Sequence, residues 1–366
     1  MTTRLFSLWA IGFTLGCEPA ADDPSQTDPG EAPMNEVISL VVDATDRETF
    51  AYVDLDTATV LGPEAASSAD WELAIRRFEI RTNGGDSGSG QVMAGLAVDP
   101  EGFYDASGEP VVDAFVQADA EAQLAALTTP FTTPALSSDR IEGVFSEDWF
   151  DYNPQTGIAT ANLDIGWLIR NGEGDGFARV RMNDLDFPTR EGNGIQSFSV
   201  AVEVEDAKGL QKPVFFEGSV PGEGGEVCYD MEADENVPCT GTAWDLMLGF
   251  SGRDSFIYTN SGDIGDGAGG ALGPYPWKVL ETYTRASASP EGSDLSPRFF
   301  VDETQSVFST ESWYAYDLQN QFRLYPNYRV YAVQVSDEGP LYGVQVAGYY
   351  DDADVAGHVT LRFLEL

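Results

Sequence analysis

Apolar and polar side chains alternate with a period of two along much of this chain. The stretch 328–335 (YRVYAVQV) alternates, a turn-forming Asp-Glu-Gly-Pro follows at 337–340, and 341–347 (LYGVQVA) resumes the pattern. Stretches 50–55 and 197–205 are similar. Such alternation predicts strands with one buried face, and a short turn between two of them predicts a hairpin. We therefore expect an all-β, mainly antiparallel fold.

Only one segment of note predicts a helix. It runs from about residue 117 to 127 (QADAEAQLAAL) and is rich in strong helix formers. Because strands do not alternate with helical patterns, a TIM barrel or a Rossmann fold is disfavoured. We expect few, short helices over the sheets.

Two blocks of sequence occur twice, in the same order. The first block spans 71–90; it begins with Trp-Glu-Leu and ends with Thr-Asn-Gly-Gly-Asp-Ser-Gly-Ser-Gly. Its partner spans 244–267; it begins with Trp-Asp-Leu and ends with Thr-Asn-Ser-Gly-Asp-Ile-Gly-Asp-Gly. The second block, Val-Phe-Ser-Glu-Asp-Trp at 144–149, recurs as Val-Phe-Ser-Thr-Glu-Ser-Trp at 307–313. The Thr recurs 177 residues later and the Trp 164 residues later. The shared order and similar spacing indicate a tandem duplication.

Each copy is long enough to be a domain rather than a solenoid repeat. We therefore predict two tandem β domains, at 36–212 and 213–366, which meet at Lys212-Pro213 after the alternating stretch 197–205. On this prediction each domain has its own core.

The composition restricts the partners more than the fold. Hydrophobic residues make up 42% of the chain and aromatic residues 12%, which is enough for substantial cores, while the formal net charge is −42. That charge repels phosphate backbones, so we expect no nucleic-acid binding. An anionic lipid surface is also a poor docking site. The simplest interpretation is a solvated acidic surface.

Residues 1–17 predict an export signal. Arg4 precedes an apolar run at 5–15 that is too short to span a bilayer, and Gly16-Cys17 follows. The site resembles a bacterial lipobox with Cys17 as the lipidated residue, although Thr14 stands where Leu is usual; an ordinary secretory signal is the alternative. The acidic, Pro-containing segment 18–35 predicts a flexible tether. Later segments are not apolar enough to cross a membrane, so we expect attachment through the lipid alone.

Cys228 and Cys239 remain once Cys17 is set aside. A pair of cysteines in an exported protein favours a disulfide. Zinc needs more ligands than two cysteines, and the sequence around them contains no histidine. We expect a structural disulfide and no metal.

Other motifs are weak. The run 265–270 satisfies G-x-G-x-x-G but is followed by Ala-Leu-Gly-Pro, a poor helix start for a dinucleotide site. The Asp-Gly segments 86–90 and 263–267 lack EF-hand spacing, and turns that need positive φ explain their glycines.

Catalysis finds little support in the sequence. The single histidine, His358, lies in an expected last strand without a G-x-S-x-G motif, and a strand histidine is most often a surface residue. Carboxylate pairs are too frequent in so acidic a chain to indicate glycoside hydrolysis. We therefore expect a protein that is not an enzyme.

The repeated blocks resemble the HmuY family of bacterial haem-binding lipoproteins. The resemblance covers nearly all of the chain beyond the tether. It is carried by these segments: 52–57 (YVDLDT), 70–77 (DWELAIRR), 80–85 (IRTNGG), 330–335 (VYAVQV), 342–346 (YGVQV), 348–350 (GYY) and 361–363 (LRF). It implies an all-β domain, attachment to the outer membrane with a periplasmic or surface-exposed body, and capture of haem through two axial histidines.

The sequence departs from that pattern because it has one histidine. Methionine and tyrosine also ligate haem iron, so weak candidates besides His358 are Met93, Met182, Met231 and Met247, although core packing explains a methionine equally well. The leading hypothesis is a non-enzymatic envelope lipoprotein that binds haem or a related hydrophobic ligand. The alternative is a cell-surface module that binds an envelope protein or glycan without haem.

Overall fold

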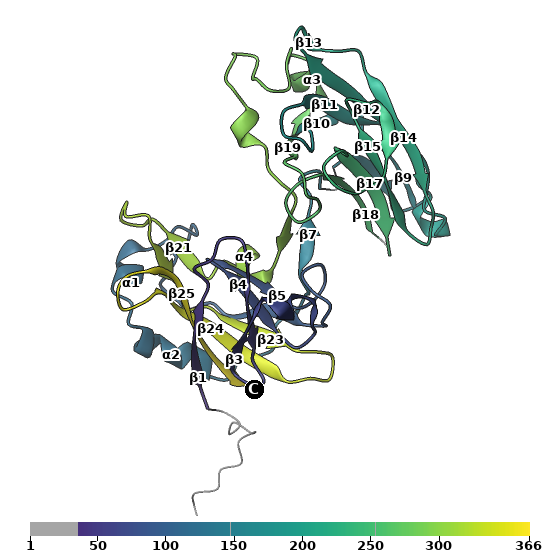
Figure 1. The fold of residues 1–366 in the computed structure, drawn as a ribbon. Coiled ribbons are helices and arrows are strands. Elements are labelled where there is room, and N and C mark those ends of the chain that lie inside the picture. Colours follow the sequence, from purple (N-terminus) through teal and green to yellow (C-terminus); the bar gives the residue numbers. More distant parts are fainter. Residues whose placement is uncertain (1–35, 147, 253) are drawn as a thin grey trace, which may run out of the picture.

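The chain folds into two β lobes joined by a narrow junction (Figure 1). The computed structural model describes residues 36–146, 148–252 and 254–366. The expected signal segment, Cys17 and the tether at 18–35 lie outside the described residues. The terminal lobe contains residues 36–139 and 306–366, and the central lobe contains residues 143–302.

The terminal lobe is built from two sheets and a hairpin, all antiparallel. The five-stranded sheet has the order β1 (Ile38–Asp43), β25 (Ala356–Glu365), β24 (Leu341–Tyr350), β23 (Val330–Gln334), β6 (Met93–Val98). The four-stranded sheet has the order β3 (Thr59–Leu61), β2 (Ala51–Asp54), β4 (Leu73–Arg76), β5 (Glu79–Thr82). The other elements are the hairpin β21 (Tyr314–Tyr316) and β22 (Leu324–Pro326), and the helices η1 (Pro63–Ser67), α1 (Val112–Val116), α2 (Ala120–Thr128) and α4 (Val307–Thr310).

The central lobe has the same strand order. Its large sheet runs β14 (Val214–Val220), β12 (Ile195–Asp206), β11 (Phe177–Asp186), β10 (Ile165–Arg170), β19 (Gly270–Pro276), with β13 (Gly209–Leu210) also paired to β12. The small sheet runs β16 (Glu235–Val237), β15 (Gly225–Asp230), β17 (Leu246–Ser251), β18 (Asp254–Thr259). The other elements are the hairpin β8 (Phe150–Asn153) and β9 (Ile158–Ala161), and the helices α3 (Trp277–Leu280), η2 (Thr189–Glu191) and η3 (Ser296–Arg298).

The prediction of an all-β, antiparallel fold with few short helices is confirmed. The expected hairpin is β23–β24, in which Val330 lies opposite Gln345. The expected helix starts later, as α2, because the Asp119 side chain accepts a hydrogen bond from the Glu121 N–H and caps it there. None of the described helices is long and apolar enough to cross a bilayer.

The predicted boundary at Lys212-Pro213 is wrong. Val202 and Phe216, one on each side of it, are both fully buried in the core of the central lobe. In the terminal lobe, Val53 and Val359 share another core although more than three hundred residues separate them. The physical reason is strand pairing: β1 pairs with β25 and β12 pairs with β14, so each lobe needs segments from both predicted domains.

Two short strands form the junction between the lobes. β7 (Arg140–Glu142) pairs antiparallel with β20 (Glu303–Gln305), with Ile141 opposite Thr304. We call this pair the junction ribbon. Each lobe therefore connects to the other through two extended segments, and the residues beside them face both lobes.

Candidate junction pocket

A pocket of about 530 Å³ lies beside the junction ribbon. Its walls come from the turn between β4 and β5 (76–81), from Gly262 and Asp263 of the central lobe, from β20 with Ser306, and from the segment 308–314. These segments are remote in sequence and meet only because the ribbon brings the two lobes together. The volume is typical of sites for small ligands.

Charged side chains form a connected network along one wall of the pocket. Glu79 accepts hydrogen bonds from both Arg76 and Arg81, and Arg81 also donates to Asp263 at 2.9 Å, which joins the two lobes. The Arg76 and Arg81 guanidinium groups lie over the Phe50 ring, at 4.4 and 4.9 Å from its centroid. Planar guanidinium groups held by carboxylates and an aromatic face are fixed in orientation.

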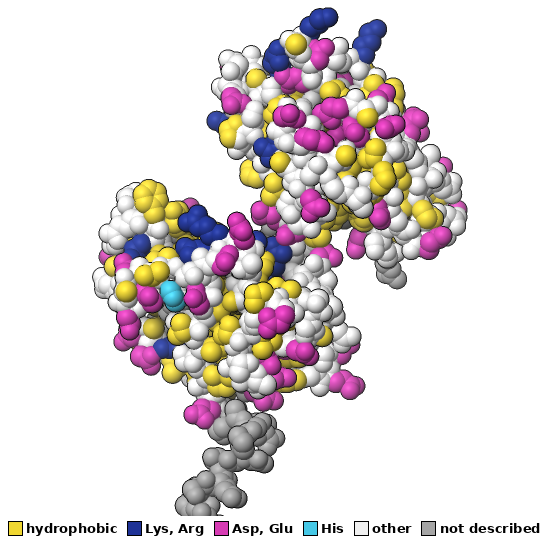
Figure 2. Space-filling view, in the orientation of Figure 1, with side chains coloured by type: hydrophobic (Ala, Val, Ile, Leu, Met, Phe, Trp, Pro, Cys, Tyr) yellow, Lys and Arg dark blue, Asp and Glu magenta, His cyan; other side chains and the backbone are white. Residues whose placement is uncertain are grey.

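The balance of charge in the pocket is slightly negative. Glu303 lines it as a third carboxylate, and burial raises the pKa of Glu303, with the charges of Glu79 and Asp263 adding to the effect. Burial opposes ionisation of Asp263 as well, but the Thr304 N–H and the Arg81 guanidinium lower the pKa of Asp263. Figure 2 shows Lys and Arg side chains gathered on the terminal lobe beside the junction.

Aromatic side chains form another part of the wall. Phe78 is 50% exposed and packs edge-to-face against Tyr314, with ring centroids 5.8 Å apart. Burial raises the pKa of the Tyr314 hydroxyl. Among the described residues this hydroxyl makes no hydrogen bond, so it is free to contact a ligand. An exposed aromatic ring beside fixed donors and acceptors suits an amphipathic ligand.

The corresponding position of the central lobe is filled differently. By the sequence repeat, Glu79 and Arg81 correspond to Phe256 and Tyr258, whose rings stack with centroids 4.7 Å apart. A Cβ at Gly143 would lie 2.7 Å from Tyr258 Cε1, so the ring rests directly on this glycine. The duplication therefore has one polar version of the site and one aromatic version.

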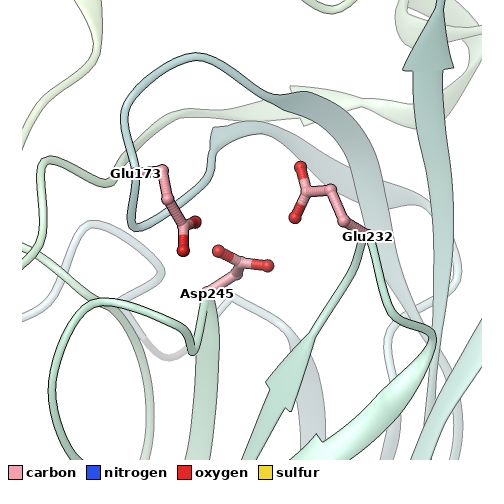
Figure 3. Close-up of side chains that lie close together, drawn as sticks. All are labelled: Glu173, Glu232 and Asp245. Atoms are coloured by element: carbon pink, nitrogen blue, oxygen red, sulfur yellow. The ribbon is translucent and has the colours of Figure 1, made fainter.

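A second group of polar side chains lies in the central lobe. Carboxylate oxygens of Glu173, Glu232 and Asp245 lie within 4.8 Å of one another (Figure 3). Asp245 is completely buried and accepts the N–H groups of Gly172 and Met231, both at 2.7 Å. In the terminal lobe the corresponding Glu72 is also buried and accepts the Leu55 N–H at 2.6 Å.

The protonation of these acids reflects their burial. Burial raises the pKa of Asp245 to about 6, against the two backbone N–H bonds that favour its charged form. Burial, together with the charge of Asp245, raises the pKa of Glu232 to about 7. Three carboxylates are a ligand set that Ca²⁺ accepts, but both oxygens of Asp245 are already bonded to the backbone. We assign this group a structural role, and Glu72 shows that the role does not need three acids.

The candidate iron ligands from the sequence do not come together. His358 is half-buried on β25 opposite Asp43, and Met93 is on β6 opposite Gln334. His358 and Met93 are three strands apart in the five-stranded sheet. Along the strand direction they are also separated by about eight residues of β24, which is roughly 25 Å at ~3.3 Å per residue. Two side chains can ligate the same iron atom only if both reach it, so His358 and Met93 cannot hold one haem together.

The remaining methionines lie in the central lobe. Met182 and Met231 are buried in its apolar core, as core packing predicts, and Met247 lies on β17 opposite Tyr258. His358 and the four methionines are all absent from the walls of the junction pocket.

The other motifs have structural roles. Cys228 and Cys239 form a disulfide across eleven positions. Asp86 and Asp263 accept the backbone N–H groups of Ile141 and Thr304 in the junction ribbon. The glycines of 86–90 and 263–267 do not have the positive φ that the turn interpretation expects; that conformation occurs just before the segments, at Gly85 and Gly262. Inside the segments the reason for glycine is space, because a Cβ at Gly88 or Gly265 would lie 2.1 or 2.0 Å from the side-chain oxygen of Asn83 or Asn260. The Gly-rich run at 265–270 leads into strand β19, not a helix.

Sequence reasoning missed the residues of the junction pocket. The chain has only 19 Lys and Arg residues, and three arginines fall at positions 76, 77 and 81 within the first repeated block. This local excess of positive charge in an acidic chain was a usable signal. The sequence contained no such signal for Asp263 and Tyr314, because only the fold brings these residues to the junction pocket.

Three solved structures are similar to this chain at low identity. A protein of Bacteroides vulgatus ATCC 8482 described as HmuY-like and haem-binding is 10% identical, covers 90% of this chain and 91% of its own, and has a TM-score of 0.30. A protein of Bacteroides fragilis NCTC 9343 described as a lipoprotein is 10% identical over 92% of each chain, with a TM-score of 0.31. The apo form of an HmuY analogue of Tannerella forsythia is 12% identical over 91% of this chain and 98% of its own, with a TM-score of 0.32. Scores this low carry no argument about the arrangement of the lobes.

Comparison with families is more informative. None of the curated proteins compared with this chain matches it. The sequence profile of the family described as HmuY protein matches residues 46–363, a range that includes both lobes. The match covers most of the chain and contains all the segments that carry the resemblance. The chain belongs to the HmuY family.

Proposed function

We propose that this protein is a non-enzymatic, lipid-anchored protein of the cell envelope that binds haem or a related hydrophobic ligand in the junction pocket. Family membership supports the class of ligand. The observation that carries the location is the pocket itself, where aromatic rings and two arginines face one volume of about 530 Å³.

The pocket matches the two chemical parts of haem. The rings of Phe78, Phe308 and Tyr314 supply apolar contact for a flat macrocycle. Arg76 and Arg81 supply donors for propionate carboxylates. The Tyr314 oxygen is the one side-chain atom of the wall that belongs to a known class of axial ligand, since tyrosine binds haem iron in some proteins.

The carboxylates of the pocket oppose this binding. Glu79 and Asp263 already accept from the two arginines, so a propionate must compete with them. Removing one competitor without changing its shape should therefore strengthen the binding of an anionic ligand. Substitution of Tyr314 and substitution of Glu79 should therefore change the affinity for haem in opposite directions.

The experiment is a haem titration of the purified chain, followed by the Soret band. We expect a saturable shift for the wild type, about tenfold weaker binding in Tyr314→Phe, and several-fold tighter binding in Glu79→Gln. His358→Gln and Met93→Leu are matched controls that should bind as the wild type does. A Soret spectrum that stays that of free haem would remove haem from the proposal, and loss of binding in His358→Gln alone would move the site out of the pocket.

A surface interaction module is the second candidate. It is favoured because His358 and the four methionines, the iron ligands expected from the sequence, do not line the pocket, and because Phe78 is half exposed among hydrogen-bonding groups. Such an arrangement also suits a glycan, with its hydroxyls and apolar ring faces. Binding to an array of envelope polysaccharides that is lost in Phe78→Ala and unaffected by haem would favour this candidate. An array without bound polysaccharide would exclude the glycan.

A further inference from the structure

The strands of the two lobes correspond one to one, apart from the two-residue strand β13. The strands β1 to β6 of the terminal lobe correspond in order and pairing to β14 to β19 of the central lobe. The hairpin β21–β22 and the strands β23 to β25 correspond in the same way to β8–β9 and β10 to β12. Each lobe is thus the same fold, built from a first half and a second half.

Several side-chain hydrogen bonds of the first halves are repeated between the same pairs of groups. Thr82 donates its N–H and its hydroxyl to Asp139, and Thr259 donates the same two groups to Asp302. The Asn83 amide bonds the Trp71 carbonyl and the Gly90 N–H. The corresponding bonds of the second copy join Asn260 to the Trp244 carbonyl and the Gly267 N–H. The sequence repeat is therefore a structural repeat.

The halves within a lobe come from different copies. In the terminal lobe the first half is 36–139, from copy one, and the second half is 306–366, from copy two. In the central lobe the second half is 143–210, from copy one, and the first half is 214–302, from copy two. The large sheets show the exchange directly, because β25 pairs with β1 and β12 pairs with β14.

The junction ribbon lies where the exchange must occur. β7 follows Asp139 and β20 follows Asp302, so the two strands are corresponding segments of the two copies, and they pair antiparallel with each other. Segments that cross between two lobes side by side are what an exchange of identical elements produces. Asp86 and Asp263 hold the crossing segments at corresponding backbone N–H groups.

We propose that this chain is two copies of one domain that have reciprocally exchanged their second halves across the junction ribbon, a domain swap within one polypeptide. Residues 36–212 and 213–366 are then each split between the lobes, and neither folds alone. The exchange also forms the junction pocket, because its walls combine Arg81 of copy one with Asp263 and Tyr314 of copy two.

Cross-strand disulfides distinguish the exchanged from the unexchanged arrangement. In the structure Val41 of β1 lies opposite Thr360 of β25. The residue that corresponds to Thr360 in copy one is Ser199, which lies opposite Glu217. Without exchange, Val41 would lie opposite Ser199. Both designs use the same Val41→Cys change in a Cys17→Ser background, so they are matched, and opposed residues of neighbouring strands are within disulfide range.

The test adds a protease site between Lys212 and Pro213, in an exposed connection, and cuts the folded, oxidised chain. We expect the two fragments to stay together on a native sizing column. Under denaturing, non-reducing conditions, Val41→Cys/Thr360→Cys should keep them joined, whereas Val41→Cys/Ser199→Cys should release them. The native complex must also have the mass of a single chain on the sizing column, which excludes exchange between two molecules. Fragments that separate natively, or a Val41→Cys/Thr360→Cys chain that stays reduced while Val41→Cys/Ser199→Cys oxidises, would overturn the proposal.

Discussion

Asp302 is the buried acid that closes the central lobe beside the junction ribbon, and its removal gives a sharp stability prediction. Its side chain is completely buried and accepts three hydrogen bonds, from the N–H groups of Val144 and Thr259 at 2.8 and 2.7 Å and from the Thr259 hydroxyl at 2.7 Å. We expect Asp302→Ala to destabilise the central lobe strongly, and Asp302→Asn to do so less.

The magnitude follows from the donors left without partners. The Thr259 hydroxyl can still bond Ser261 at 2.8 Å, but the two backbone N–H groups lose their acceptor. A buried donor without a partner costs about 1–3 kcal/mol, and a bond to a charged group contributes about 1.5–3 kcal/mol. Burial raises the pKa of Asp302, so relief of the buried charge offsets part of the loss. We expect about 3–5 kcal/mol for Asp302→Ala and about 2 kcal/mol for Asp302→Asn, which keeps one acceptor oxygen.

Asp105 provides the matched control. It also accepts three hydrogen bonds, from the Ser107 N–H, the Ser107 hydroxyl and the Glu109 N–H, but its side chain is exposed. Water replaces a lost acceptor there, so Asp105→Ala should cost less than about 1 kcal/mol. The two variants differ in burial and not in the number of bonds.

The assay is urea denaturation followed by far-UV circular dichroism and tryptophan fluorescence. With a slope of about 2 kcal/mol per molar urea, Asp302→Ala should lower the midpoint of the central lobe by about 2 M. If Asp302→Ala and Asp105→Ala shifted their midpoints equally, burial would not be the deciding factor and the reasoning would be refuted.

Three further predictions concern the central lobe. Because the pKa of Asp245 and of Glu232 is raised in the folded state, these two acids contribute stability that is fully present below about pH 4 and is lost as pH rises to about 6–7. Glu232→Gln should therefore reduce the fall in melting temperature over this range relative to the wild type, and an equal fall in both proteins would contradict the prediction. Reduction of the Cys228–Cys239 disulfide, which spans eleven positions, should lower the free energy of unfolding by about 2–3 kcal/mol. Urea denaturation with and without reductant measures this difference, and equal midpoints would show that the bond does not restrict the unfolded chain. Gly143→Ala should cost about 1–3 kcal/mol in the same assay, because its Cβ meets Tyr258. In a Tyr258→Ala background the same change should cost much less, and an equal cost in both backgrounds would contradict this cause.

The sequence by itself determined the local structure and the existence of the repeat. Alternation at 328–335 and 341–347 specified a hairpin because side chains in a strand alternate between two faces whatever the partner strand is. The glycines of 86–90 and 263–267 were not readable in this way, because close contact with Asn83 and Asn260, which depends on the fold, and not a positive φ requires them. The repeated blocks correctly indicated two similar folded bodies, and the resemblance they carried gave the family.

Only the tertiary structure decided which half pairs with which. The two copies offer β1 two corresponding partner strands, β12 and β25, and the alternation of apolar side chains along one strand does not say which of them it pairs with. The pairing is determined at the junction, where the three-residue strands β7 and β20 continue into the neighbouring lobe and do not turn back into their own. The junction pocket depends on the same choice, because Arg81, Asp263 and Tyr314 share a wall only when the second halves have crossed.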